Sequence, residues 1–284
     1  MKKIIFPLIV ISSLILSSIA CSFSVNLPEV KTGPTQVLAI AEPRPDENQE
    51  MRLTVEMGAG DLNISGGADG LVEGEIRYNI EEWRPQVTRQ SSRLRISQDN
   101  LHNVRLPTNQ VVNDWHLSLG NTPLDLTISA GAYRGTLDLS AVPLTNLSIS
   151  DGASQAEVRF EQPNLVEMTR FSYQTGASEV KIIGIGNANP EIFSFEGGAG
   201  SYTLDFSGQL QRDIDANVTT GISNLEIVVP QGVPARVTIS GGLNNIQPRG
   251  TWTVNNNVYQ TSGSGPQIHI TVNMGLGNLV LVSN

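Results

Sequence analysis

The chain of 284 residues contains one cysteine. A single thiol excludes an internal disulfide framework and a cysteine-based zinc site. Charged residues make up only 16% of the chain, and acids outnumber bases to give a net charge of −9. Because nucleic acid attracts proteins with a positive field, this balance argues against a nucleic-acid partner. The three histidines are not close in sequence, so we expect no histidine-rich metal site.

Residue patterns that support catalysis are also scarce. Asp114, His116 and Ser118 alternate along one predicted strand and therefore share a face. Their side chains would stand about 7 Å apart per step, which is too far for a nucleophile to contact its base. We interpret this trio as a solvated polar face. The sequence predicts a protein that is not an enzyme, with no catalytic residues, no cofactor and no metal.

Aromatic residues form only 5% of the chain. They either line a sugar-binding strip or pack in the core and at its corners, and we favour packing. The residues concerned are Trp83, Trp115, Trp252, Tyr133, Tyr173, Tyr202 and Tyr259.

The N-terminus carries an export signal. Lys2 and Lys3 precede a charge-free stretch from Ile4 to Ala20, too short for a typical membrane-spanning helix. The stretch ends at Cys21, and Ser18-Ile19-Ala20-Cys21 resembles the bacterial lipobox, in which the cysteine receives a lipid. We predict that residues 1–20 are a signal peptide and that a lipid on Cys21 anchors an extracytoplasmic protein, at the cell surface or in the periplasm. The alternative is an ordinary secretory signal that ends near a cysteine.

Residues 21–47 are predicted to be a flexible tether between the lipid and the body. This segment contains four prolines among mixed polar residues and one short apolar patch, Val37–Ala41.

Beyond this segment the sequence predicts only strands. Leu53, Val55 and Met57 alternate with polar residues, and similar alternation returns many times along the chain. Strict alternation indicates a strand with one buried face. No convincing helical period follows residue 50, and 27 glycines and 15 prolines fit an all-β protein.

A glycine turn recurs ahead of these strands. From Gly131 to Gly221 the steps are 21, 24, 22 and 23 residues, and Gly242 follows 21 residues later. A glycine at such a turn is explained by a positive φ or by close approach of neighbouring backbones. The alanine that commonly follows is predicted to point into a tight inner position. The predicted structural turns are Gly58, Gly60, Gly131, Gly152, Gly176, Gly198, Gly221, Gly242 and Gly275.

A period near 22 residues indicates units that must stack to bury their apolar faces. Two all-β architectures satisfy this requirement: a single-chain β-solenoid with coils of about 22 residues, or an antiparallel β-sandwich. The irregular steps favour the solenoid. We divide the body into an N-terminal β region, residues 48–110, and a repetitive solenoid, residues 111–284.

The end of the chain lacks a clear cap. Leu279–Val282 is apolar on both faces, and as the last strand it would expose an open edge. We predict that residues 248–266 fold back over this edge with Trp252 or Tyr259 covering apolar surface. The alternative is an open end that a partner strand completes.

The segment Met51–Trp83 resembles the N-terminal domain of the toast-rack family of bacterial envelope proteins. The resemblance includes Gly58-Ala59-Gly60-Asp61-Leu62, the corner Trp83-Arg84-Pro85, and a second block that begins at Asn113-Asp114-Trp115. The segment Pro234–Leu281 is similar to the toast-rack domain that ends LiaF-type cell-wall-antibiotic response proteins. The family implies a non-catalytic envelope role and offers no catalytic residues to transfer.

These observations predict a surface lipoprotein whose β-repeat body is an adhesin-like interaction or scaffold module of the envelope. The alternative is a sensor of cell-wall or antibiotic stress that binds a small envelope ligand. The expected partners are the membrane, through the lipid on Cys21, and an envelope protein or cell-wall glycan. The sequence does not predict the oligomeric state.

Overall fold

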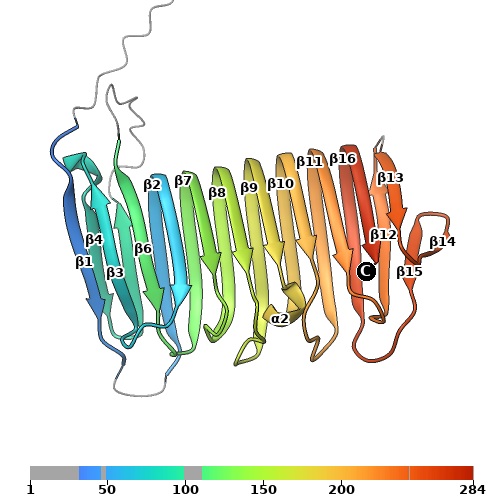
Figure 1. The fold of residues 1–284 in the computed structure, drawn as a ribbon, viewed down its shortest axis with the longest axis horizontal. Coiled ribbons are helices and arrows are strands. Elements are labelled where there is room, and N and C mark those ends of the chain that lie inside the picture. Colours follow the sequence, from blue (N-terminus) through green and yellow to red (C-terminus); the bar gives the residue numbers. More distant parts are fainter. Residues whose placement is uncertain (1–31, 46–48, 99–110, 243, 284) are drawn as a thin grey trace, which may run out of the picture.

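A computed structural model describes residues 32–45, 49–98, 111–242 and 244–283. These residues form one 16-stranded sheet that winds into a flattened tube, with successive coils side by side along its length (Figure 1). Neighbouring coils pair in parallel, so the predicted all-β solenoid is confirmed and the antiparallel sandwich is wrong. The only α-helix among the described residues is the single turn α2 (Ile185–Ala188).

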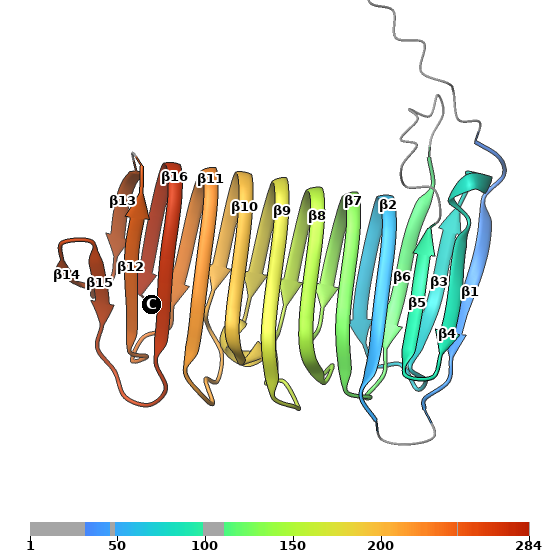
Figure 2. The same ribbon diagram turned by 180° about the vertical axis from the view of Figure 1, so that it is seen from behind.

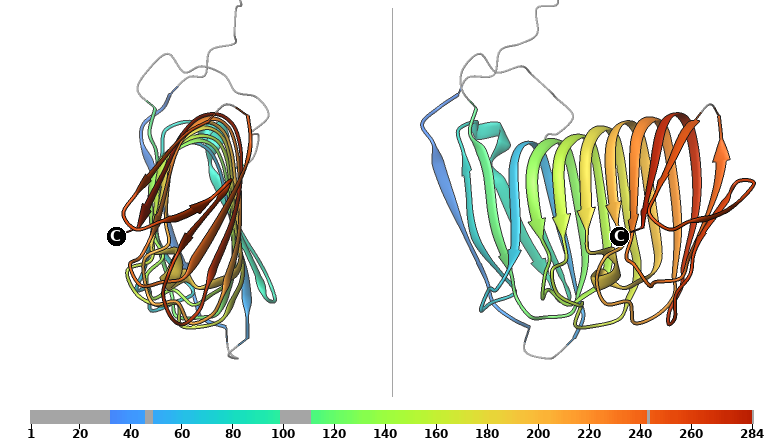
Figure 3. Two further views of the ribbon diagram at one scale, coloured as in Figure 1. Left: turned by 90° about the vertical axis from the view of Figure 1, so that its right-hand side faces the viewer. Right: turned by 45° about the vertical axis from the view of Figure 1, so that its right-hand side comes forward.

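Each coil in the middle of the tube is one long strand that bends over on itself. The first half of the strand lies on one broad face and the second half on the other, as the view along the tube shows (Figure 3). In both halves alternate side chains point into the same core, where Leu53, Val55, Leu62 and Ile64 of the first coil are buried. The long strands are β2 (Met51–Gly66), β7 (Leu124–Asp138), β8 (Leu144–Arg159), β9 (Met168–Ile183), β10 (Pro190–Asp205), β11 (Ile214–Val229) and β16 (Ile268–Ser283).

The N-terminal end of the tube is closed by short strands (Figure 2). Two of them, β5 and β6, form a split coil that pairs in parallel with the two halves of β2. Antiparallel strands extend this coil outward: β3 and then β1 from β6, and β4 from β5. The strands are β1 (Gln36–Glu42), β3 (Val72–Tyr78), β4 (Pro85–Gln90), β5 (Arg93–Gln98) and β6 (Asn113–Leu119), with a 3₁₀ turn, η1, at Glu81–Trp83.

Two predicted boundaries need correction. The tether does not extend unbroken to residue 47, because Gln36–Glu42 is strand β1 and pairs residue by residue with β3. Its apolar patch contributes Ile40 to the core, which explains why this part of a proline-rich segment joins the sheet. The predicted boundary at residue 110 does not divide the fold either. Strand β2, which precedes residue 110, pairs directly with β6 and β7, which follow it.

The C-terminal end also departs from the order of the sequence. The last strand, β16, lies between β11 and the split coil formed by β12 (Ala235–Gly241) and β13 (Asn244–Arg249). The prediction that Leu279–Val282 forms an exposed edge is therefore wrong, because β13 covers it. A hairpin of β14 (Thr253–Asn255) and β15 (Val258–Thr261) pairs with β12, and its Tyr259 is buried. Residues 248–266 thus contribute a hairpin to this end of the tube, as expected. The hairpin pairs with β12, however, and does not cover the Leu279–Val282 edge.

Glycines stack along the rim where the long strands bend. A Cβ atom added to Gly176 would lie 2.4 Å from the carbonyl oxygen of Gly152, and one added to Gly198 would lie 2.4 Å from that of Gly176. Close approach between coils therefore explains these glycines. In spatial order the stack comprises Gly58, Gly131, Gly152, Gly176, Gly198, Gly221, Gly275 and Gly242.

Gly60 differs from the stack, because its φ is +153° and an added Cβ would lie 2.0 Å from the carbonyl oxygen of Asn113. The predicted inner position for the alanine after each glycine is wrong. Ala132, Ala153 and Ala177 are exposed on the outer surface of the rim, and Ile222 continues this line with 65% of its surface exposed.

Candidate functional site

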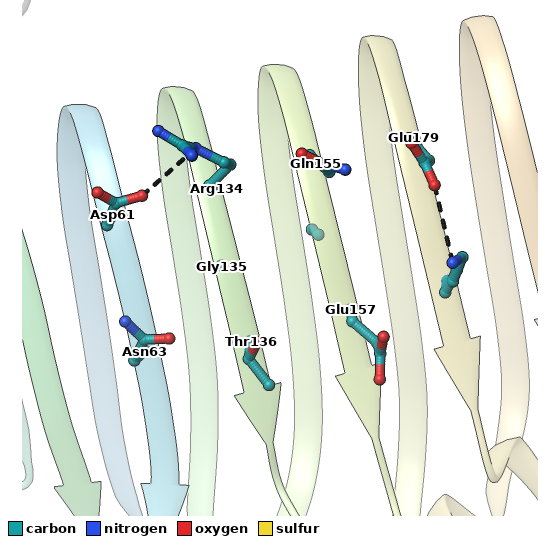
Figure 4. Close-up of a pocket in the computed structure, with 10 residues that line it drawn as sticks. Asp61, Asn63, Arg134, Gly135, Thr136, Gln155, Glu157 and Glu179 are labelled. Carbon is teal, nitrogen blue, oxygen red and sulfur yellow. Dashed lines mark ion pairs between the residues drawn. The ribbon is translucent and has the colours of Figure 1, made fainter.

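The second halves of the long strands carry a charged outer face. Residues in register there include Asp61, Arg134 and Gln155, one coil apart. A shallow hollow of about 340 Å³ lies among these side chains (Figure 4). We call this surface the charged face, defined by Asp61, Asn63, Arg134, Thr136, Gln155, Glu157, Glu179 and Lys181.

Most charges of the charged face have a partner on the same face. The Arg134 Nε lies 3.6 Å from the Asp61 Oδ1, an ion pair that joins two coils (Figure 4). Lys181 Nζ lies 3.7 Å from Glu179 Oε1, and Arg159 pairs with Glu157. Because these pairs are largely exposed, each contributes little to stability. They leave a polar surface of mixed charge.

The first halves of the strands carry a different outer face, rich in small hydroxyl side chains. One row runs in register across the coils from β2 to β12 and contains no charged residue over that length. Its members recur at the strand separation of about 4.8 Å. We call this surface the hydroxyl face, defined by Thr54, Thr127, Ser148, Ser172, Ser194, Asn217, Thr271 and Thr238.

Beneath the rim the core contains a polar cluster around the buried carboxylate of Asp151. The Tyr173 hydroxyl donates to Asp151 Oδ2 at 2.7 Å, and the hydroxyls of Ser154 and Thr175 also donate to this carboxylate. Since Tyr173 donates to Asp151, the Tyr133 hydroxyl is the donor in its 3.2 Å bond to Tyr173. The Asp151 carboxylate is thus surrounded by hydrogen-bond donors within the core. We interpret this cluster as stabilising the fold.

Burial raises the pKa of both Tyr133 and Tyr173 above the ordinary range of a phenol, because the charged form would lose its hydration. The nearby charge of Asp151 raises the pKa of each further. The sequence contained no signal for this cluster, because its members come from three strands, β7, β8 and β9, and meet only when the coils stack.

The candidates from the sequence lie as follows. Asp114, His116 and Ser118 face outward from β6, and the polar ends of Asp114 and Ser118 contact Arg77 and Ser65. Most of the aromatic side chains pack in the core, as the sequence interpretation favoured, and they do not line a surface strip: Trp115, Tyr133, Tyr173, Tyr202 and Tyr259.

Cys21 lies outside the described residues, so its lipidation stays a prediction. Among the described residues, no three His, Cys, Asp or Glu side chains come together as a possible metal site. The same residues include no helix of the length and apolarity that crossing a bilayer would require.

Fold and surface together define a class: a parallel β-solenoid with polar outer faces. A sequence model described as the N-terminal domain of toast_rack, DUF2154, matches residues 29–183. The match covers more than half of the chain, and the chain therefore belongs to the toast-rack family. This confirms the resemblance of the N-terminal part, while the similarity of Pro234–Leu281 to LiaF-type proteins lies beyond the matched residues.

Solved structures include similar chains. A candidate cell adhesion protein from Clostridium sporogenes is 18% identical, with a TM-score of 0.51 over 88% of this chain and 99% of its own. A candidate adhesin from Bacteroides fragilis is 13% identical, with a TM-score of 0.35 over 87% of this chain and 96% of its own. At 18% identity, the similarity to the Clostridium sporogenes protein shows a shared fold alone. No curated protein matches the sequence.

Proposed function

We propose that this protein is a lipid-anchored, extracytoplasmic scaffold that binds a protein partner of the bacterial envelope through its charged face. The supporting observation is the rigid array of the charged face, where side chains from successive coils surround a solvent-open hollow. Parallel coils hold the backbone under these side chains at constant spacing, so a partner that binds does not have to order the backbone as well. The adhesion-related name of the Clostridium sporogenes protein and the envelope role that the sequence resemblance implies agree with a non-catalytic surface module.

A second candidate function is binding of a cell-wall glycan by the hydroxyl face. A glycan chain repeats hydroxyl groups along an extended polymer, and the uncharged row from Thr54 to Thr238 offers repeated donors and acceptors. This candidate corresponds to the wall-sensing alternative, but it uses hydroxyl side chains because most of the aromatic ones are buried.

The anchor is tested by Cys21→Ser. We expect the wild-type protein to incorporate labelled palmitate and to sediment with membranes, because two or three acyl chains give stable anchoring. The variant should incorporate no label and appear in the soluble fraction. Ser22→Ala, which leaves the cysteine in place, is the matched control and should behave as wild type. Unlabelled wild-type protein would overturn the lipid anchor.

The two faces are compared by placing a photo-crosslinking amino acid at Thr136 or at Thr127. Both are threonines on β7, but Thr136 lines the hollow of the charged face and Thr127 belongs to the hydroxyl face. A protein adduct in whole cells from position 136 and none from position 127 is the expected result. Glycan adducts from position 127 alone would favour the second candidate, and an absence of adducts at both positions would contradict the interaction module.

A further inference from the structure

The outermost described strand at the N-terminal end, β1, has one edge with which no other described strand pairs. Among the described residues β1 pairs with β3 alone. The carbonyl oxygen of Glu42 accepts a bond from the backbone of Leu71, on the side of β3. Backbone groups alternate sides along a strand, so the N–H and C=O groups of Val37, Ala39 and Ala41 point away from β3.

Most of the exposed side chains of this strand are apolar, and Gln36 is the exception. Val37 has 59% of its surface exposed, and Ala39 and Ala41 lie on the same outward face. On the other face Leu38 is half-buried beside the buried Ile40. An edge strand that is apolar on both faces is a template for pairing with another strand, and natural proteins commonly guard such edges with charges. Here the only charged residue in the strand is Glu42, whose carboxylate is paired with Arg89.

We propose that β1 pairs antiparallel with β1 of a second copy of this chain, about a two-fold axis at Ala39. In this register Val37 faces Ala41 of the second copy, and Leu38 faces its Ile40. Apolar residues therefore meet apolar residues on both faces of the strand.

The ends of the strand agree with the same register. Gln36 faces Glu42 of the second copy, so the residue directly opposite the carboxylate is a neutral amide. The outward backbone groups of Val37, Ala39 and Ala41 then form the hydrogen-bonded pairs of the antiparallel ladder. Because the same patch is used by both copies, the interface is closed and gives a dimer.

The length of chain before β1 allows both copies to reach one membrane. Gly33 is bonded to the backbone of Asn79 in the body, and the roughly 11 residues between Cys21 and Gly33 span up to about 40 Å when extended. The two β1 strands run in opposite directions, so their leading segments leave the paired strands at opposite ends, about 24 Å apart for seven residues. The extended length of each leading segment exceeds this separation, so both lipids can reach the same membrane.

Disulfide trapping tests the register, using the full chain with Cys21→Ser so that the introduced cysteine is the only one. In Ala39→Cys the two residues at position 39 face each other as a hydrogen-bonded pair with Cα atoms about 5.5 Å apart. This separation permits a disulfide. Ala41→Cys is the matched control, because it has the same chemistry on the same face. Its two cysteines would lie four residues apart along the strands, about 14 Å.

Under mild oxidation we expect Ala39→Cys to form covalent dimers at least tenfold faster than Ala41→Cys. Equal rates for the two variants, or no dimer from Ala39→Cys, would overturn the proposal.

Light scattering gives an independent measurement. Ala39→Pro removes an outward N–H that β3 does not use, and proline is tolerated on an edge strand. Ala39→Thr keeps this donor and is the control. We expect the Cys21→Ser protein and its Ala39→Thr form to have about twice the monomer mass, and Ala39→Pro to have the monomer mass with unchanged circular dichroism. A monomeric Ala39→Thr form, or a dimeric Ala39→Pro form, would contradict pairing through β1. Because these measurements use chains without the lipid and do not involve the charged face, they are independent of the proposed function.

Discussion

Gly176→Ala is expected to lower the free energy of unfolding by about 2–3 kcal/mol, within the range measured for overpacked interiors. The new methyl group would lie 2.4 Å from the carbonyl oxygen of Gly152, which belongs to the backbone of the neighbouring coil. To relieve this contact the coils must separate at the rim. Since each coil is stabilised by its neighbours, a separation in the middle of the stack weakens both adjoining interfaces.

Ala177→Val is the matched control for this substitution. Ala177 is the next residue along the same bend, but it is exposed and points outward. Adding two methyl groups there should change the free energy of unfolding by no more than about 0.5 kcal/mol. Urea unfolding followed by circular dichroism measures both variants. A Gly176→Ala variant as stable as wild type would contradict the prediction. It would mean that the rim accommodates the methyl group without losing hydrogen bonds between the coils.

Alkaline pH is expected to destabilise the protein through the tyrosines near Asp151. Tyr133 and Tyr173 have a raised pKa in the folded state, and their pKa in the unfolded chain is near 10. Above pH 10 the unfolded chain loses these phenolic protons while the folded protein retains them. The stabilisation from the two groups is therefore complete below about pH 9 and decreases as the pH rises above 10.

The expected slope is about 1.4 kcal/mol per pH unit for each tyrosine. Tyr133→Phe removes one titrating group and the hydrogen bond to Tyr173, at a cost of about 1 kcal/mol at neutral pH. Its stability should then fall less steeply than that of wild type above pH 10. Urea unfolding at a series of pH values from 8 to 11 provides the comparison. Parallel curves for the two proteins would show that Tyr133 ionises as readily in the folded state as in the unfolded chain.

Local pattern was sufficient to predict the strands and the class of fold. The alternation at Leu53, Val55 and Met57 requires one buried face, and the structure buries all three. The glycine period predicted stacked coils because a bend that touches its neighbour leaves no room for a Cβ atom. Local pattern failed for the alanines, since exposure and tight burial both favour a small side chain at a bend.

The sequence by itself determined that the body is a stack of β coils with a recurring glycine bend. The sequence also contains the basic start, the charge-free stretch and the cysteine that together predict a lipid on Cys21. Only the tertiary structure decided the order of the coils at the two ends, where β16 lies inside β12 and β13, and β5 and β6 lie outside β2. Every coil presents the same apolar alternation, so spacing along the chain does not distinguish one neighbour from another. The choice depends on contacts between distant residues, such as Val272 beside both Val218 and Ile239, and on the hairpin that closes the end.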